Sequence, residues 1–252
     1  MKRYIIAALV FLCSFTLKAI NEEQENYQKA NGWYQKGDYK KAVIEYEKII
    51  QNGYESPELY YNLGNSYYKL FDYKSAILNY ERAKRLAPND EDILFNLRLA
   101  NLNTVDKIEP LPPFFLKNWW MDVVHLHNAT DWAIISIVAF ALTSLFGIFF
   151  LLTNAQIGKK ICFSAAVLFL CFSILSFSFA RTMDMLQYHT KEAILFVSNS
   201  YIKSSPSDKS TDLFLLHEGT KMSVLDNVGS WTKIRLVNGD EGWIKSNEIR
   251  II

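Results

Sequence analysis

Two long apolar runs in the second half of the chain constrain its fold more than any other feature. Neither the run from Trp132 to Leu152 nor the run from Ile161 to Ala180 contains a charged residue. As helices rising about 1.5 Å per residue, each is long enough to cross a hydrocarbon layer about 30 Å thick. A helix apolar on every side for that length is typical of a membrane span. We therefore predict transmembrane helices at 132–152 and 161–180, which excludes a plain soluble globular protein.

The ends of this hairpin predict its orientation. The connecting loop, 153–160, contains Lys159 and Lys160 and no acidic residue, which favours the cytoplasmic side of a membrane. Residues 1–19 have a positively charged start and an apolar core, the pattern of a secretory signal peptide, with an uncleaved anchor as the alternative. An exported N-terminus places the segments before and after the hairpin on the same, non-cytoplasmic face of the membrane.

Composition excludes several function classes. The chain has 252 residues, with 27 Lys and Arg against 26 Asp and Glu. This near-zero net charge does not indicate a nucleic-acid partner. All three cysteines lie in apolar runs, which leaves no Cys-ligated metal in the polar segments. The four histidines are scattered, and His125 and His127 have the wrong spacing to share a helix face. We predict no catalytic site, no metal and no cofactor.

The segment 20–108 repeats itself at an offset of 34 residues. Asp38-Tyr39-Lys40 returns as Asp72-Tyr73-Lys74. This period resembles the tetratricopeptide repeat, in which small residues let paired helices approach and aromatic residues fill the space between repeats. A further helix over Glu91–Leu102 is expected to act as a capping half repeat. Other residues that match at this offset are Asn31 with Asn65, Ala42 with Ala76, Tyr46 with Tyr80 and Glu47 with Glu81.

The first helix of each repeat lines a concave groove in this family, which makes these helices the candidate peptide-binding site. Amide side chains pair with the backbone of an extended peptide, and tyrosines offer contact area with a polar tip. The alternative is that the tyrosines only pack between repeats. The predicted groove residues are Tyr27, Asn31, Tyr34, Tyr61, Asn62, Asn65 and Tyr68, continued by Phe95 and Asn96 on the capping helix.

Some tetratricopeptide domains clamp a carboxylate terminus with two asparagines and three cations. Asn31 and Asn62 match the two asparagine positions, but the cation positions hold Tyr27, Asp92 and Asn96. The sequence therefore does not favour a ligand with a free carboxylate terminus.

Residues 109–131 join the repeats to the first apolar run. Pro110, Pro112 and Pro113 exclude a helix at the start of this segment and form a stiff spacer. Trp119 and Trp120 follow, and tryptophan beside a membrane span is typical of the lipid interface. We expect this part of the chain to contact membrane lipid.

Short alternating segments dominate residues 188–252 and predict a small all-β barrel, with a hairpin turn at Asn238-Gly239. The segment Gly239–Ile244 and the triplet Glu218-Gly219-Thr220 resemble bacterial SH3-like domains, which bind peptides or cell-wall material. Trp231 and Trp243 are weak candidates for a ligand platform, and core packing is the alternative. Lys203 stands where the family usually has arginine. The expected strands are 193–197, 213–216, 221–225, 231–237 and 242–245.

The predicted fold is a multidomain membrane protein with all-α repeats, a transmembrane hairpin and an SH3-like barrel. This order resembles the BatE-type family of the aerotolerance (Bat) operons of Bacteroides and related bacteria. The resemblance implies an inner-membrane protein with both terminal domains in the periplasm. It also implies neighbours that include membrane proteins with von Willebrand A domains and an AAA-type ATPase, and a role in envelope integrity and tolerance of oxidative stress.

Three functions follow as hypotheses. The first is a scaffold whose two modules hold partner proteins at the membrane. The second is a tether in which the barrel binds peptidoglycan and the hairpin anchors it. The third is a stress sensor that signals across the bilayer, which the short loop 153–160 makes the least favoured, because so small a loop offers little surface for an effector.

Overall fold

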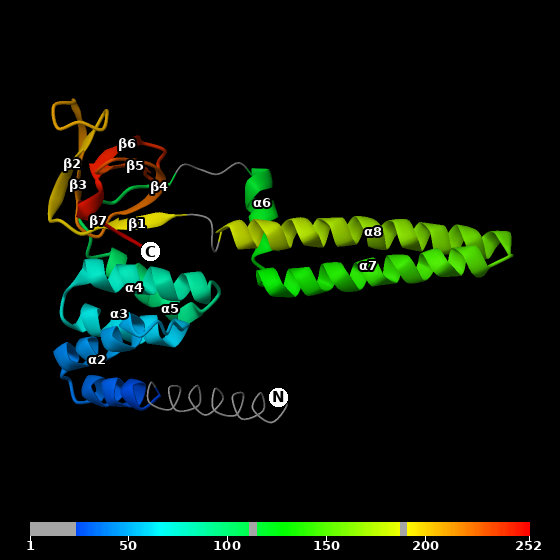
Figure 1. Ribbon diagram of the computed structural model, residues 1–252, viewed down its shortest axis with the longest axis horizontal. Helices are drawn as coiled ribbons and strands as arrows, with labels where there is room; N and C mark the ends of the chain where they lie inside the picture. The colour runs from blue at the N-terminus through cyan, green and yellow to red at the C-terminus, as the bar shows by residue number, and fades with distance from the viewer. Residues whose placement is uncertain (1–23, 111–114, 187–190) are drawn as a thin grey trace, which may run out of the picture. The chain divides into compact units, whose positions relative to one another are not determined.

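The computed structural model describes residues 24–110, 115–186 and 191–252 (Figure 1). The predicted signal peptide, 1–19, lies outside these residues. The chain divides into two compact units, which we describe separately. Of the described residues, the first unit holds 24–110 and 191–252, and the second holds 115–186.

Five helices form the repeat domain of the first unit. A helix over residues 24–35 is followed by α2 (Tyr39–Gln51), α3 (Pro57–Lys69), α4 (Tyr73–Leu86) and α5 (Glu91–Asn101). Asp38 and Asp72, 34 residues apart, begin α2 and α4 by accepting hydrogen bonds from the backbone N–H groups of Lys41 and Ser75.

Matched small and aromatic residues hold the repeats together. Ala42 and Ala76 are fully buried, and Tyr46 and Tyr80 each keep only 1% of their surface exposed. A β-carbon built on Gly64 would lie 2.7 Å from ring atoms of Tyr80, so the second repeat requires glycine where α3 meets α4. The turn before α4 has a left-handed residue, Phe71 (φ 62°), where the first repeat has glycine.

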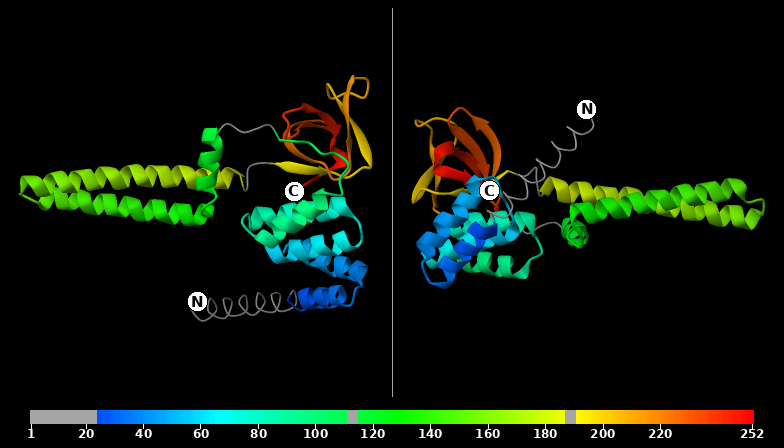
Figure 2. Two further views of the ribbon diagram at one scale, coloured as in Figure 1. Left: turned by 180° about the vertical axis from the view of Figure 1, so that it is seen from behind. Right: turned by 60° about the horizontal axis from the view of Figure 1, so that its bottom comes forward.

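The C-terminal β domain, residues 191–252, is an antiparallel sheet of seven strands in the order β3-β2-β6-β5-β4-β1-β7. Figure 2 shows that the sheet curls on itself. Its core contains Leu195, Ile202, Ile234 and Ile244. The strands are β1 (Glu192–Leu195), β2 (Asn199–Lys203), β3 (Asp212–His217), β4 (Lys221–Val228), β5 (Trp231–Arg235), β6 (Glu241–Lys245) and β7 (Ile249–Ile251).

Two of these strands, β2 and β7, were not expected from the sequence. β2 pairs with β3 from Asn199 to Lys203, although it buries only one side chain fully, that of Ile202. β7 has three residues and pairs with β1. The turn expected between β5 and β6 is present, with Gly239 at φ 91°.

The second unit contains α6 (Phe115–Val124), α7 (Ala129–Leu152) and α8 (Gln156–Asp184). Both α7 and α8 are long and apolar enough to cross a membrane, and they pack side by side along their length (Figure 1). The connection between them is shorter than the expected loop, because α8 begins at Gln156 and continues the helix through Lys159 and Lys160. α6 lies across α8, with the ring of Trp120 4.7 Å from that of Phe179.

Candidate binding surfaces

Tyrosine and asparagine side chains of the predicted groove form a hydrogen-bonded ladder between successive helices. In its first rung, Asn31 Oδ1 accepts from the Tyr46 hydroxyl and, at 3.3 Å, from Asn62 Nδ2. Asn62 Nδ2 also donates to the Tyr27 hydroxyl at 2.8 Å. The rings of Tyr27 and Tyr46 are 6.0 Å apart. This rung joins the helix 24–35 to α2 and α3.

The second rung repeats the first at the 34-residue offset. Asn65 Oδ1 accepts from the Tyr80 hydroxyl at 2.7 Å and from Asn96 Nδ2 at 2.8 Å. Asn96 Nδ2 also donates to the Tyr61 hydroxyl at 2.9 Å. The rings of Tyr61 and Tyr80 are again 6.0 Å apart. The ladder is therefore a property of the repeat rather than of one site.

The ladder depends on neutral tyrosines. Burial raises the pKa of Tyr46 and of Tyr80 well above the ordinary value for a phenol. Both hydroxyls therefore keep their protons at physiological pH and remain donors to the asparagine oxygens.

The ladder uses only one end of each amide. It uses the oxygens of Asn31 and Asn65 and the nitrogens of Asn62 and Asn96, so the opposite end of each amide is not committed by these bonds. An amide fixed in this way has lost its rotamer freedom before a ligand arrives. The side chains predicted to line the groove therefore make contacts between successive helices, and whether they also bind a peptide stays a prediction.

The two remaining groove tyrosines are held by aromatic contacts. Tyr34 packs edge-on against Tyr39 with ring centres 5.3 Å apart, and Tyr68 packs against Tyr73 at 5.5 Å. These pairs also stand 34 residues apart and repeat one geometry.

Positions that hold cations in carboxylate-clamping domains have other roles in this protein. Tyr27 and Asn96 belong to the ladder, and Asp92 is exposed near the start of α5. Because none of these three residues is a cation, they suit the backbone amides of a ligand better than a carboxylate.

A second candidate surface is a pocket of about 260 Å³ on the β domain. Tyr201, with 57% of its surface exposed, lies beside it, and Trp231 and Lys245 line it. The Lys245 ammonium is 5.7 Å from the centre of the Trp231 ring and 2.8 Å from the Asp208 carboxylate. The pocket thus offers an aromatic wall with charges of both signs at its rim.

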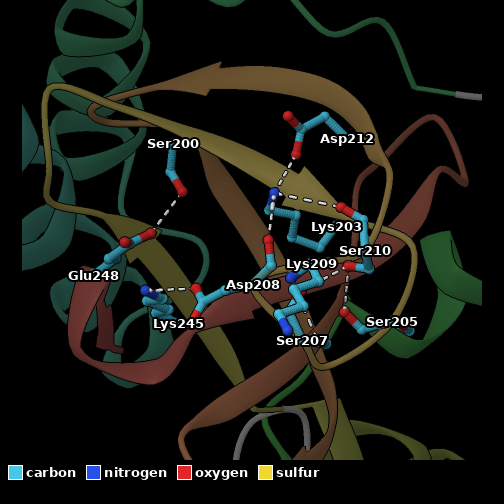
Figure 3. A network of polar contacts seen from close by, with 10 residues as sticks. All are labelled: Ser200, Lys203, Ser205, Ser207, Asp208, Lys209, Ser210, Asp212, Lys245 and Glu248. Atoms are coloured by element: carbon cyan, nitrogen blue, oxygen red, sulfur yellow. Dashed lines mark hydrogen bonds and ion pairs between the residues drawn. The ribbon is translucent and has the colours of Figure 1, made fainter.

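A network of polar contacts orders the loop between β2 and β3 beside this pocket (Figure 3). The Lys203 ammonium points into the loop, where it pairs with the Asp212 carboxylate at 2.5 Å and donates to the carbonyls of Asp208 and Ser210. On the opposite rim, the Ser200 hydroxyl donates to Glu248. Lys203 therefore acts as an internal point charge, which needs no planar guanidinium.

The two predicted platform tryptophans differ in position. Trp231 is 92% buried and still forms a wall of the pocket. Trp243 is half-buried in β6, where it pairs across the sheet with Lys203 and Lys233. Only Trp231 lines the pocket.

A contact between the repeat domain and the β domain was not expected from the sequence. Ala193 and Leu195 of β1 point into the β-domain core, whereas Ile194 between them joins the cluster of Ile77 and Leu97 in the repeat domain. All three β1 residues are fully buried. A strand apolar at consecutive positions is typical of burial on both faces, and this was the signal available in the sequence.

Ionic contacts surround this apolar centre. Lys221 pairs with Glu81 of α4 at 2.9 Å and with Glu192 of β1 at 2.7 Å. Burial alone would lower the pKa of Lys221, but the two carboxylates outweigh it and raise the pKa above its ordinary value. Lys74 pairs with Glu218 at 2.6 Å. The interface therefore joins complementary charges around buried Ile194.

Asp106, which follows α5, forms hydrogen bonds to the β domain. Its carboxylate accepts from the backbone N–H of His217 at 2.7 Å, from the His217 ring at 2.9 Å and from the Thr220 hydroxyl at 2.6 Å. Burial alone would raise the pKa of Asp106, but these hydrogen bonds outweigh it and hold the pKa below its ordinary value. A β-carbon on nearby Gly219 would lie 2.9 Å from Thr104, so the two domains approach closely here.

The paired apolar helices have a polar contact of their own. The Ser136 hydroxyl donates to the Ser173 carbonyl at 3.0 Å, and the Ser173 hydroxyl donates to the Ser136 carbonyl at 2.9 Å. Within α7, Ala139 is buried against the partner helix, whereas a β-carbon on Gly147 would meet nothing within 4 Å. Reciprocal serine bonds and small residues are typical of helix contacts in membranes.

Over the described ranges, no group of three or more His, Cys, Asp or Glu residues is arranged to hold a metal ion. His217 has its own role in the bond to Asp106.

Two parts of the chain match known families. Residues 57–90, which contain α3 and α4, match the tetratricopeptide repeat, and residues 198–250 match the bacterial SH3 domain. No curated protein matches the chain. The chain therefore combines helical tetratricopeptide-like repeats, two candidate transmembrane helices and an antiparallel β domain that matches bacterial SH3 domains. Both matched families are typically non-catalytic interaction modules, suited to binding proteins or peptidoglycan.

Proposed function

We propose that this protein is a non-enzymatic inner-membrane scaffold that presents its repeats and its β domain to the periplasm for the assembly of other proteins. We further propose that the assembly acts in aerotolerance, oxidative stress or envelope integrity, as the resemblance to BatE-type proteins implies. The two family matches and the two candidate spans support the coarse part of this proposal.

The Tyr/Asn ladder is the observation that carries the proposal. A packing role alone would be filled by apolar side chains of similar size, without amide groups that must find partners. The ladder instead fixes Asn31, Asn62, Asn65 and Asn96 in one repeated geometry and leaves one end of each amide for another partner. Rigid amides at regular intervals suit the backbone of an extended peptide.

The proposed topology places both domains outside the cytoplasm. Lys159 and Lys160 mark the cytoplasmic end of the hairpin under the positive-inside rule. An extracytoplasmic location also suits a domain that matches bacterial SH3 domains. Fusion of alkaline phosphatase after Ile252 tests this topology, and an inactive fusion contradicts it.

Photo-crosslinking from the groove in native membranes tests the scaffold. We replace Phe95, which is 57% exposed and in register with Tyr61, by benzoylphenylalanine. The control carries the same group at Ile44 of α2, which is 53% exposed. We expect the Phe95 variant to crosslink a membrane protein with a von Willebrand A domain and the Ile44 variant not to. Equal crosslinking from both positions, or none from either, contradicts the proposal.

The pocket beside Trp231 supports an alternative function, a tether that binds peptidoglycan through the β domain. Its aromatic wall and rim charges suit a sugar–peptide polymer. The test is co-sedimentation of the detergent-solubilised chain with purified sacculi, comparing Tyr201→Ala with Arg235→Gln, which lies outside the pocket. The tether predicts that only Tyr201→Ala weakens sedimentation, and no sedimentation of the unaltered chain removes it.

A further inference from the structure

A second pocket, of about 290 Å³, lies at the seam between the repeat domain and the β domain. Ile50 of α2 and Leu78 of α4 form part of its wall on the repeat side, and Phe196 and Arg250 form its wall on the β-domain side. None of the ladder residues lines it. The pocket is therefore separate from the predicted groove, and it exists only while the two domains are in contact.

Asn79 of α4 has an unpartnered acceptor at this pocket. Its side chain is 97% buried, and its Nδ2 donates to the Ser75 carbonyl at 2.8 Å. Its Oδ1 has no hydrogen-bond partner among the described residues. This oxygen has less than 1 Å² of exposed surface, so Asn79 is a fixed part of the wall rather than a contact for a ligand.

The charges of the pocket favour an anion. Arg82 and Arg250 both line it, against the single carboxylate of Glu47. Glu47 already accepts the hydroxyl of Tyr67, also in the lining. Arg82 is partly desolvated, and burial lowers its pKa. Arg82 donates to the Ile251 carbonyl at 3.1 Å, and Arg250 donates to the carbonyls of Asn247 and Ile249. These bonds hold both guanidinium groups in place and leave other N–H groups on each for a carboxylate.

We propose that this seam pocket binds an acidic residue of a partner polypeptide. The carboxylate of that residue binds the guanidinium groups of Arg82 and Arg250, which both line the pocket. Apolar walls at Ile50 and Phe196 cover its aliphatic part.

Binding at the seam has a thermodynamic consequence. Because the lining comes from both domains, a ligand there binds only the docked arrangement and shifts the equilibrium toward it. A partner that brings an acidic segment would thereby fix the β domain on the repeats. This inference does not require the Tyr/Asn groove to bind a peptide.

Methyl NMR spectroscopy of the detergent-solubilised full chain tests the site. The probe is N-acetyl-aspartate N-methylamide, which carries one carboxylate and two amide N–H groups, and the matched neutral probe is N-acetyl-asparagine N-methylamide. The reporters are the methyl groups of Ile50, Leu63 and Leu78, all of which line the pocket. We expect saturable shifts with the aspartate probe and at least tenfold weaker binding of the asparagine probe.

Two variants separate this pocket from other basic surfaces. Arg250→Gln, which alters an exposed residue, is expected to weaken binding of the aspartate probe about tenfold. Lys245→Gln removes a cation beside the other β-domain pocket and is expected to leave binding unchanged. The proposal is overturned if the methyl groups do not shift, if both probes bind equally, or if Lys245→Gln weakens binding as much as Arg250→Gln does.

Discussion

Asp106→Ala is the substitution that most directly probes the contact between the repeat domain and the β domain. It removes a carboxylate that is 86% buried and accepts three hydrogen bonds, two from His217 and one from Thr220. The substitution leaves the apolar part of the interface, the cluster around Ile194, unaltered. The effect therefore measures the polar contact rather than the core of either domain.

The magnitude follows from the three donors. A hydrogen bond to a charged acceptor contributes about 1.5–3 kcal/mol, but the three bonds share two oxygen atoms and are not additive. In the variant, water can hydrate the partly exposed His217 ring. The free-energy cost of burying the Asp106 carboxylate is also absent, and both effects reduce the loss of stability. We expect Asp106→Ala to destabilise the docked arrangement by about 2–4 kcal/mol and Asp106→Asn, which keeps one acceptor, by about half as much.

Hydrogen–deuterium exchange of the detergent-solubilised chain measures this change by region. A loss of 2–4 kcal/mol corresponds to roughly 25- to 700-fold faster exchange of β1, which docks on α4, while exchange in α7 and α8 stays constant. Asp226→Ala is the matched control, because it removes an equal charge from an exposed site on β4. Unchanged exchange in β1 of Asp106→Ala would refute the reasoning, as would equal acceleration in Asp226→Ala.

The same contact predicts a pH dependence. Because the pKa of Asp106 is lower in the docked state than in the undocked chain, its contribution is complete above the undocked pKa of about 3.9. The contribution is lost as pH falls through the lower docked value. Limited proteolysis at the junction should therefore accelerate below about pH 4 in the unaltered chain. Asp106→Ala should lack this component, and an identical acid profile for both would contradict the assignment.

Further substitutions test the packing of each unit. Gly64→Ala places a β-carbon 2.7 Å from the Tyr80 ring and should destabilise the repeat domain by about 1–3 kcal/mol in thermal unfolding. Gly32→Ala, which meets nothing within 4 Å, should stabilise it by up to about 1 kcal/mol, and the opposite order would disprove the close approach. Phe71→Gly introduces the residue that the first repeat has at Gly37, and it should raise the midpoint of urea unfolding by relieving about 1 kcal/mol of left-handed backbone strain. A lower midpoint would mean that the contacts of the Phe71 ring stabilise the domain by more than the strain costs. Ser136→Ala should weaken the helical hairpin by about 0.6 kcal/mol per lost bond in SDS titration, and an unchanged midpoint would show that the serine bonds contribute nothing.

The repeats and the apolar helices were predictable because their signals are local. Matched residues such as Tyr46 and Tyr80 recur at one offset, and helical packing depends on contacts close in sequence. The apolar runs 132–152 and 161–180 predict helices because, inside a membrane, an unbroken apolar segment has few other ways to form the hydrogen bonds of its backbone. Residue types and spacing suffice for both.

The strands show where local signals fail. β2 buries one side chain fully, and β7 has only three residues, so neither carries a clear alternation of polar and apolar positions. Both depend on pairing with distant strands. β7, at Ile249–Ile251, pairs with β1, at Glu192–Leu195, at the other end of the domain. A strand of this kind is defined by its neighbours rather than by its own sequence.

The sequence by itself determined the order of the parts, the repeat period and the tyrosines and asparagines that recur with it. Only the tertiary structure decided which hydrogen bonds the asparagines make, that Ile194 and Asp106 join the β domain to the repeats, and that a pocket opens between them. Asp106 and Thr220 are separated by more than a hundred positions in the chain. Periodicity records which face of an element is buried, but it does not record which distant surface covers that face.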